Sequence, residues 1–163
     1  HDEAKHRWGH GDAEVIDVAF LDGQGQRRHV FRTGEPWIVQ IRYRAQRHIA
    51  TPVFGLAIHR LDGVHICGPN THFAGLDIAS IEGDGVVSYR VEALPLLEGT
   101  YDLSLSIHNR ADTIMYDYHD RLYRFRVRRV GRGERYGLVS LGGAWSTGVF
   151  VEPADDALSV RGV

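Results

Sequence analysis

Apolar and polar residues alternate along most of this chain, and this period of two constrains the fold more than any other feature. In the stretch 37–44, the residues on the apolar side are Trp37, Val39, Ile41 and Tyr43. The same alternation recurs in 14–21, 53–60, 87–92, 101–108 and 123–128. Successive side chains of a strand point to opposite faces, so the pattern predicts strands with one buried and one solvated face.

Turn-forming residues separate these runs. The clearest is Asp62-Gly63, between the apolar-rich runs of 51–71, which predicts a hairpin with a two-residue loop. Seven or eight short strands with regular turns predict an all-β chain folded as an antiparallel β-sandwich of two sheets. The buried positions predicted from the shared phase are Trp37, Val39, Ile41, Phe54, Leu56, Leu103, Leu105, Phe125 and Val127. Ile16, Val18 and Phe20 are expected to share one face.

We expect a single domain, because the chain has 163 residues and no internal repeat or linker. Residues 11–150 form the expected sandwich, preceded by a flexible lead (1–10) and followed by a flexible tail (151–163). The formal net charge of −2 provides no overall attraction to nucleic acid, so no nucleic-acid partner is expected. No run approaches the ~20 apolar residues of a membrane-spanning helix.

No motif of catalytic spacing is present. The chain lacks a G-x-S-x-G nucleophile motif and an H-E-x-x-H metal motif, so no catalytic residue, metal ligand or cofactor is predicted. His59 and His65 are the candidates for a histidine pair across the hairpin. A two-residue loop places Arg60 rather than His59 opposite His65, which argues against that pair.

Several short motifs, in order, resemble the C-terminal domain of the Wzt family. These are Arg7-Trp8-Gly9, Gly34-Glu35, Pro52-Val53-Phe54-Gly55, Asp62-Gly63, Gly68 with Asn70-Thr71, Leu94 and Leu96 before Gly99 and Tyr101, and Tyr116-Asp117. Wzt proteins are ATP-binding subunits of bacterial O-antigen polysaccharide exporters. The resemblance implies an immunoglobulin-like sandwich that recognises an O-polysaccharide without catalysis. The ATPase half is not expected here, because the chain has no G-x-x-x-x-G-K-[ST] phosphate loop.

The resemblance also implies partners and a location. These are an O-polysaccharide, the ATPase and membrane subunits of an ABC transporter, and a second copy of the chain. Dimers of the family exchange C-terminal strands, which here corresponds to the stretch Gly137–Phe150. The implied location is the cytoplasm, at the inner face of the bacterial inner membrane.

Sugar binding needs polar side chains beside aromatic or apolar platforms on a shared surface. The outward row of 101–108 offers short or planar hydrogen-bonding groups, namely Asp102, Ser104, Ser106 and His108. Arginines alternate on neighbouring strands, and those chosen as candidates are Arg42, Arg44, Arg124 and Arg126. They flank the polar row if their strands share one sheet. Two loops add the candidates Asn70 and Tyr118. Trp8 and Trp145 lie outside the alternation and can either stack on a sugar or cover a sheet edge.

Two alternatives stay open at this point: a protein-interaction sandwich without a glycan ligand, and a polysaccharide-acting enzyme. A glycan-binding domain should carry an open polar groove over one sheet. An interaction module should expose a large apolar patch. An enzyme should carry a concave pocket with strongly perturbed titratable groups.

Overall fold

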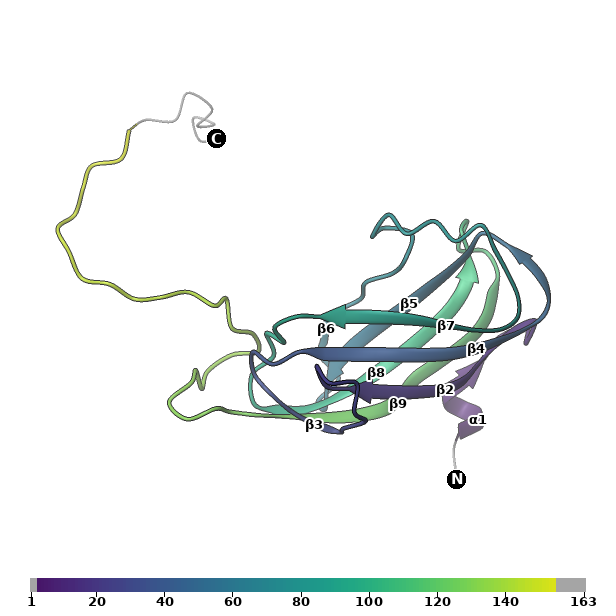
Figure 1. Ribbon diagram of the computed structural model, residues 1–163, viewed down its shortest axis with the longest axis horizontal. Helices are drawn as coiled ribbons and strands as arrows, with labels where there is room; N and C mark the ends of the chain where they lie inside the picture. Colours follow the sequence, from purple (N-terminus) through teal and green to yellow (C-terminus); the bar gives the residue numbers. More distant parts are fainter. Residues whose placement is uncertain (1–2, 155–163) are drawn as a thin grey trace.

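The computed structural model describes residues 3–154, and they form two packed β-sheets (Figure 1). The elements are α1 (Glu3–His6), β1 (Arg7–Trp8), β2 (Ala13–Leu21), β3 (Val30–Arg32), β4 (Trp37–Ala50), β5 (Pro52–Arg60), β6 (His65–Cys67), β7 (Ser80–Val91), β8 (Gly99–Asn109) and β9 (Met115–Arg128). The larger sheet has the order β1-β9-β8-β5-β6, with β3 also paired to β9, and the smaller sheet has the order β2-β4-β7. The predicted all-β, two-sheet sandwich is confirmed.

The pairing within both sheets is antiparallel except between β3 and β9, which run parallel. The layers of Figure 1 lie face to face, and their strands cross at an angle. All nine residues predicted to be buried are buried. The alternation therefore identified the inward faces of β4, β5, β8 and β9 correctly.

The core is dense in aromatic rings at one end of the sandwich. The ring centroid of Phe125 lies 5.0 Å from that of Trp37, 5.1 Å from Phe20 and 5.5 Å from Tyr101. Contacts of this kind add to the hydrophobic effect of burying large rings. The buried Tyr101 hydroxyl donates a hydrogen bond to the Leu97 carbonyl, four residues upstream. This arrangement is the tyrosine corner of immunoglobulin-like sandwiches.

One predicted inward residue points outward. Ile16 is exposed, whereas Val15 and Phe20 are buried. The pairing of β2 with β4 shifts register between Val15 and Asp17, which marks a β-bulge at Ile16. A bulge inserts one residue and reverses the alternation beyond it, so the prediction for Ile16 was wrong.

The hairpin between β5 and β6 also differs from the prediction. Its loop has three residues, because the Arg60 N–H donates to the Val64 carbonyl and the Gly63 N–H donates to the Arg60 carbonyl. Gly63 closes the turn with φ +91°, a left-handed conformation that glycine adopts without strain. His59 is consequently paired with His65, and their ring centroids are 4.9 Å apart.

The two ends of the described chain lie at opposite ends of the sandwich (Figure 1). Arg7 and Trp8, which we had assigned to the lead segment, form β1 and pair with His119 and Tyr118 of β9. Residues 129–154, here called the C-terminal arm, contain no strand: Val139 forms a single bridge with Leu96, and the chain beyond it extends away from the sheets. Most of the predicted tail (151–163) lies outside the described residues. Among residues 3–154, no helix has the length and apolar content of a membrane span.

Candidate functional site

The outward face of the larger sheet is hollowed into an open groove of about 460 Å³ over β5, β8 and β9. Small side chains form its floor. Gly55 on β5 is paired with Ser106 on β8, and Ala57 is paired with Ser104. A Cβ atom on Gly55 would lie 2.8 Å from the Ser106 Oγ, so the floor is already closely packed. The groove exists because small residues lie between bulkier ones on either side.

One wall of the groove is aromatic. Tyr118 on β9 is paired with Ser106 across the sheet. Its ring stacks on Trp8 of β1, with a centroid distance of 4.3 Å and an interplanar angle of 21°. Tyr118 had been expected in a loop, but it is a strand residue. Trp8 both covers the sheet edge and supports Tyr118, whereas Trp145 in the C-terminal arm is fully exposed.

The opposite wall consists of β5, β6 and the segment that follows β6. His59 and His65 line the groove together with Asn70. The segment runs beside β5, because the Leu56 N–H donates to the Pro69 carbonyl and the Thr71 N–H donates to the Phe54 carbonyl. Burial, followed by the charge of neighbouring His65, lowers the pKa of His59. This shift favours the neutral form of the His59 ring.

The polar groups in the groove keep unused hydrogen-bonding capacity. The Asn70 Oδ1 accepts from the Phe73 N–H, which leaves the amide nitrogen free to donate. The Ser104 Oγ accepts from the Arg121 N–H at 2.8 Å, and its hydroxyl can still donate. The His108 Nδ1 lies 2.8 Å from the Asn109 carbonyl, which leaves Nε2 for a ligand. The groove thus offers both donors and acceptors.

A buried polar network holds β9 and β1 in place behind the aromatic wall. The Asp117 carboxylate accepts hydrogen bonds from the Arg7 guanidinium, the Val15 N–H and the His119 Nε2. With Nε2 donating, the His119 Nδ1 accepts from the Tyr123 hydroxyl at 2.6 Å. Burial by itself would raise the pKa of Asp117. The bonds from His119, Arg7 and Val15 outweigh burial and lower this pKa.

The structure separates the predicted site residues into three groups. The residues that line the groove are Ser104, Ser106, His108, Asn70 and Tyr118. Asp102 and Arg124 lie farther along the same face and form a two-pronged ion pair, with N···O distances of 2.8 and 3.1 Å. Arg126 lies beyond them on β9 and is exposed.

Arg42 and Arg44 form the third group, and they do not flank the polar row. Both belong to β4 in the smaller sheet. Arg44 pairs with Asp84 and Arg42 lies 3.8 Å from Asp17, so each is engaged with a carboxylate there. The condition under which Arg42 and Arg44 would flank the polar row, a sheet shared with β8, is therefore not met.

The groove residues that sequence reasoning missed include Gly55, Ala57, His59 and His65. Gly55 and Ala57 are small residues on the outward side of β5, a sign that a strand face is open. His59 and His65 were considered only as a metal pair. Among residues 3–154, no group of three or more His, Cys, Asp or Glu side chains is placed to hold a metal ion.

The fold and the groove define a class: a small immunoglobulin-like sandwich domain with a ligand-sized polar groove on one sheet. The chain matches the family described as the Wzt C-terminal domain over residues 4–141. It belongs to that family, as the sequence resemblance indicated. Family membership places the chain in the context of ABC exporter ATPase subunits. No curated protein sequence matches the chain.

Solved structures agree on the fold. The crystal structure of the C-terminal domain of Wzt superposes with a TM-score of 0.75 at 20% sequence identity, covering 86% of this chain and 87% of that chain. Part of the Bacteroides uniformis β-glucuronidase superposes with a TM-score of 0.47 at 14% identity, covering 66% of this chain and 14% of that one. The second similarity is too weak to support any inference.

Proposed function

We propose that this domain recognises a bacterial O-antigen-type polysaccharide without catalysis and couples its capture to export by an ABC transporter. The observation that supports the proposal most is the groove on the larger sheet. Its volume falls within the range of about 300–1,000 Å³ typical of small-molecule sites. Sugars need hydroxyl partners and a flat apolar surface, and Ser106, Asn70 and Tyr118 offer these together.

The groove favours binding over hydrolysis. Most glycoside hydrolases use two carboxylates that flank the scissile bond. None of the residues lining the groove is Asp or Glu. The nearest carboxylate on the outward row of β8, Asp102, already has both oxygens engaged by Arg124. A polysaccharide-acting enzyme is therefore the less favoured alternative.

The family context suggests the further partners. We infer that the domain works beside the ATPase and membrane subunits of the exporter, on the cytoplasmic face of the inner membrane. A β-sandwich with its groove open along the strands can hold an internal or terminal segment of a long chain. The groove residues support binding of a glycan in general. The identity of the sugar, its linkage and its terminal group have to be measured.

We also propose a homodimer formed by exchange of the C-terminal arm. The arm carries exposed apolar residues along an extended path, namely Leu141, Trp145, Val149 and Phe150. Strand β7 is an edge of the smaller sheet, and its Val86 and Tyr89 are exposed. An extended segment from a second copy can pair with such an edge. Sedimentation should show a dimer for the full chain and a monomer after deletion from Gly137 onward. A full chain that stays monomeric at micromolar concentration contradicts the exchange.

Isothermal titration with O-polysaccharide from the source bacterium tests the glycan proposal. Ser106→Trp fills the groove floor and should abolish binding. The matched control is Gln40→Trp, at an exposed outward position of the smaller sheet, which should bind as the unaltered chain does. Both variants should melt at the same temperature as the unaltered chain, so that a loss of binding does not reflect unfolding. The proposal fails if Ser106→Trp retains full affinity or if the polysaccharide does not bind the unaltered chain.

A further inference from the structure

The arginines of the domain differ in whether a carboxylate neutralises them. Those in salt-bridge contact with Asp or Glu are Arg7, Arg27, Arg28, Arg42, Arg44, Arg47, Arg60, Arg90, Arg110, Arg121 and Arg124. The others within residues 3–154 are Arg32, Arg126, Arg128, Arg129, Arg132 and Arg135. All of this second group belong to β3, β9 or the start of the C-terminal arm, so the uncompensated positive charge is concentrated at one end.

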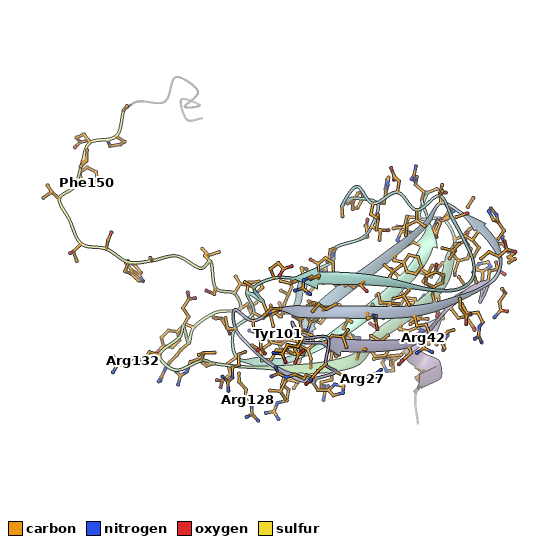
Figure 2. The ribbon with its side chains drawn as sticks, viewed as in Figure 1. Arg27, Arg42, Tyr101, Arg128, Arg132 and Phe150 are labelled. Carbon is orange, nitrogen blue, oxygen red and sulfur yellow. The ribbon has the colours of Figure 1, made fainter. Side chains whose placement is uncertain are left out.

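Three of these residues lie on the same face as the groove. Phe125 and Val127 point into the core, so Arg126 and Arg128 point outward. The parallel pairing of β3 with β9 places Arg32 beside Arg128. We call Arg32, Arg126 and Arg128 the arginine strip. Figure 2 shows Arg128 and Arg132 at the end of the sandwich where the C-terminal arm begins.

The arginine strip borders a second hollow. It has a volume of about 500 Å³, and Arg126 and Arg128 line it together with Arg129 and Thr100. One carboxylate, that of Glu98, also lies there and accepts a hydrogen bond from the Arg129 N–H at 3.3 Å. The guanidinium groups therefore outnumber the carboxylates in this hollow. The chain as a whole has a net charge of −2, so the excess is local.

The hollow and the groove follow one another along strand β8. Arg126 is paired with Thr100, four residues before Ser104 on β8. At a rise of about 3.3 Å per residue, this separation is roughly 13 Å along the strand. A polymer that occupies the groove and runs along β8 passes Asp102 and Arg124, which neutralise each other, before it reaches the arginine strip.

We propose that the glycan bound in the groove is anionic, and that its carboxylate or phosphate groups bind the arginine strip a few sugar units away. This inference rests on the proposed function. Guanidinium groups bind carboxylate and phosphate oxygens with two parallel hydrogen bonds. Like charges on neighbouring strands, such as Arg32 and Arg128, repel each other in the free domain. An anionic ligand removes that repulsion, whereas a neutral glycan leaves it in place.

The test uses O-polysaccharide from the source bacterium in three forms: untreated, with its carboxylates reduced to alcohols, and with its phosphates removed. Titrations compare the unaltered chain with the triple variant Arg32→Ala, Arg126→Ala and Arg128→Ala. The charge-matched control is Arg42→Ala, Arg44→Ala and Arg90→Ala on the smaller sheet. The strip variant should bind untreated polysaccharide about tenfold more weakly, since each exposed ion pair contributes modestly. The control variant should bind normally.

Chemical removal of the anion should have the same effect as removal of the arginines. Either carboxyl reduction or dephosphorylation should weaken binding to the unaltered chain by about tenfold, and the strip variant should then show no further loss. Raising NaCl from about 50 to about 300 mM should weaken binding to the unaltered chain more than to the strip variant. The treatment that acts identifies the anionic group.

The outcomes separate this inference from the function on which it rests. If Ser106→Trp abolishes binding but the strip variant does not weaken it, the groove function stands and the anionic inference is overturned. If no form of the polysaccharide binds the unaltered chain, the proposed function and the anionic inference are both overturned. Binding of a short single-stranded DNA or of phosphatidylglycerol vesicles, at equal affinity and with the same dependence on the arginine strip, would show a non-specific anion surface and also overturn it.

Discussion

The outward faces of the two sheets are built from similar residues and differ in what those residues contact. On the smaller sheet, Arg44 pairs with Asp84 and Arg90 pairs with Glu92, so these charges neutralise each other. On the larger sheet, small residues open a groove, and within residues 3–154 the arginines of the strip form no ion pair with a carboxylate. Alternating polar residues therefore do not define a binding face. The difference lies in the neighbours of each side chain: arginines meet carboxylates on the smaller sheet, and small residues leave a groove open on the larger one.

Loss of the Asp117 charge should have the largest effect on stability. Asp117→Asn removes the charge to which Arg7 and His119 are hydrogen-bonded, and breaking a buried charged network costs about 3–5 kcal/mol. Asp84→Asn, in the exposed pair on the smaller sheet, should leave the free energy of unfolding unchanged within error. Urea denaturation of both variants measures the contrast. Equal effects would show that the larger sheet is not held by this network.

Core truncation should also distinguish the two sheets. Leu105 is buried at the centre of β8, so Leu105→Ala should cost about 2–5 kcal/mol. Val87 on the edge strand β7 is only partly buried, and Val87→Ala should cost about 1 kcal/mol. Denaturant midpoints at constant m-value give both numbers. A loss at Val87 as large as that at Leu105 would contradict this difference between the central and the edge strand.

Acid should weaken the network behind the aromatic wall. The pKa of Asp117 is lower in the folded chain than in the unfolded chain, so its contribution to stability is present above the unfolded pKa of about 4. That contribution is lost as the pH falls through the folded pKa. The unaltered chain should therefore lose more stability below pH of about 4 than Asp117→Asn does. Parallel pH curves for the two chains would contradict this assignment.

Groove side chains should have the smallest energetic effects. His108→Ala removes one hydrogen bond to the glycan, worth about 0.5–1.5 kcal/mol of binding free energy. Tyr118→Ala removes a stacking surface of comparable value. Titration with the source polysaccharide should show these losses with little change in melting temperature. An unchanged affinity for Tyr118→Ala would place the sugar elsewhere in the groove.

The sequence predicted those parts of the fold that depend on local alternation. Leu103, Leu105, Phe125 and Val127 were assigned correctly because neighbours in the chain decide which face of a strand is apolar. The sheet that a strand joins depends on distant partners, so the sequence could not decide whether Arg44 lies beside the polar row. Ile16 was misplaced because a bulge leaves no mark in the alternation.

The site was partly predictable for the same reason. Ser104, Ser106 and His108 share a strand face, and period two alone brings them together. Gly55 and Ala57 form the floor only because β5 pairs with β8, which the sequence does not display. The pairing of His59 with His65 depends on whether the hairpin loop has two residues or three. Asp62-Gly63 is compatible with either loop length, and only the hydrogen bonds of the folded turn distinguish the two-residue loop from the three-residue loop.

The central claim is that the glycan lies on the outward face of the larger sheet. Chemical-shift mapping of the isotope-labelled chain during titration with oligosaccharides from the source polysaccharide tests it most directly. We expect the amide signals of Gly55, Ser106 and Tyr118 to shift together, while those of Gln40 and Ser88 on the smaller sheet stay in place. Shifts confined to β2, β4 and β7, or to the C-terminal arm, would contradict it.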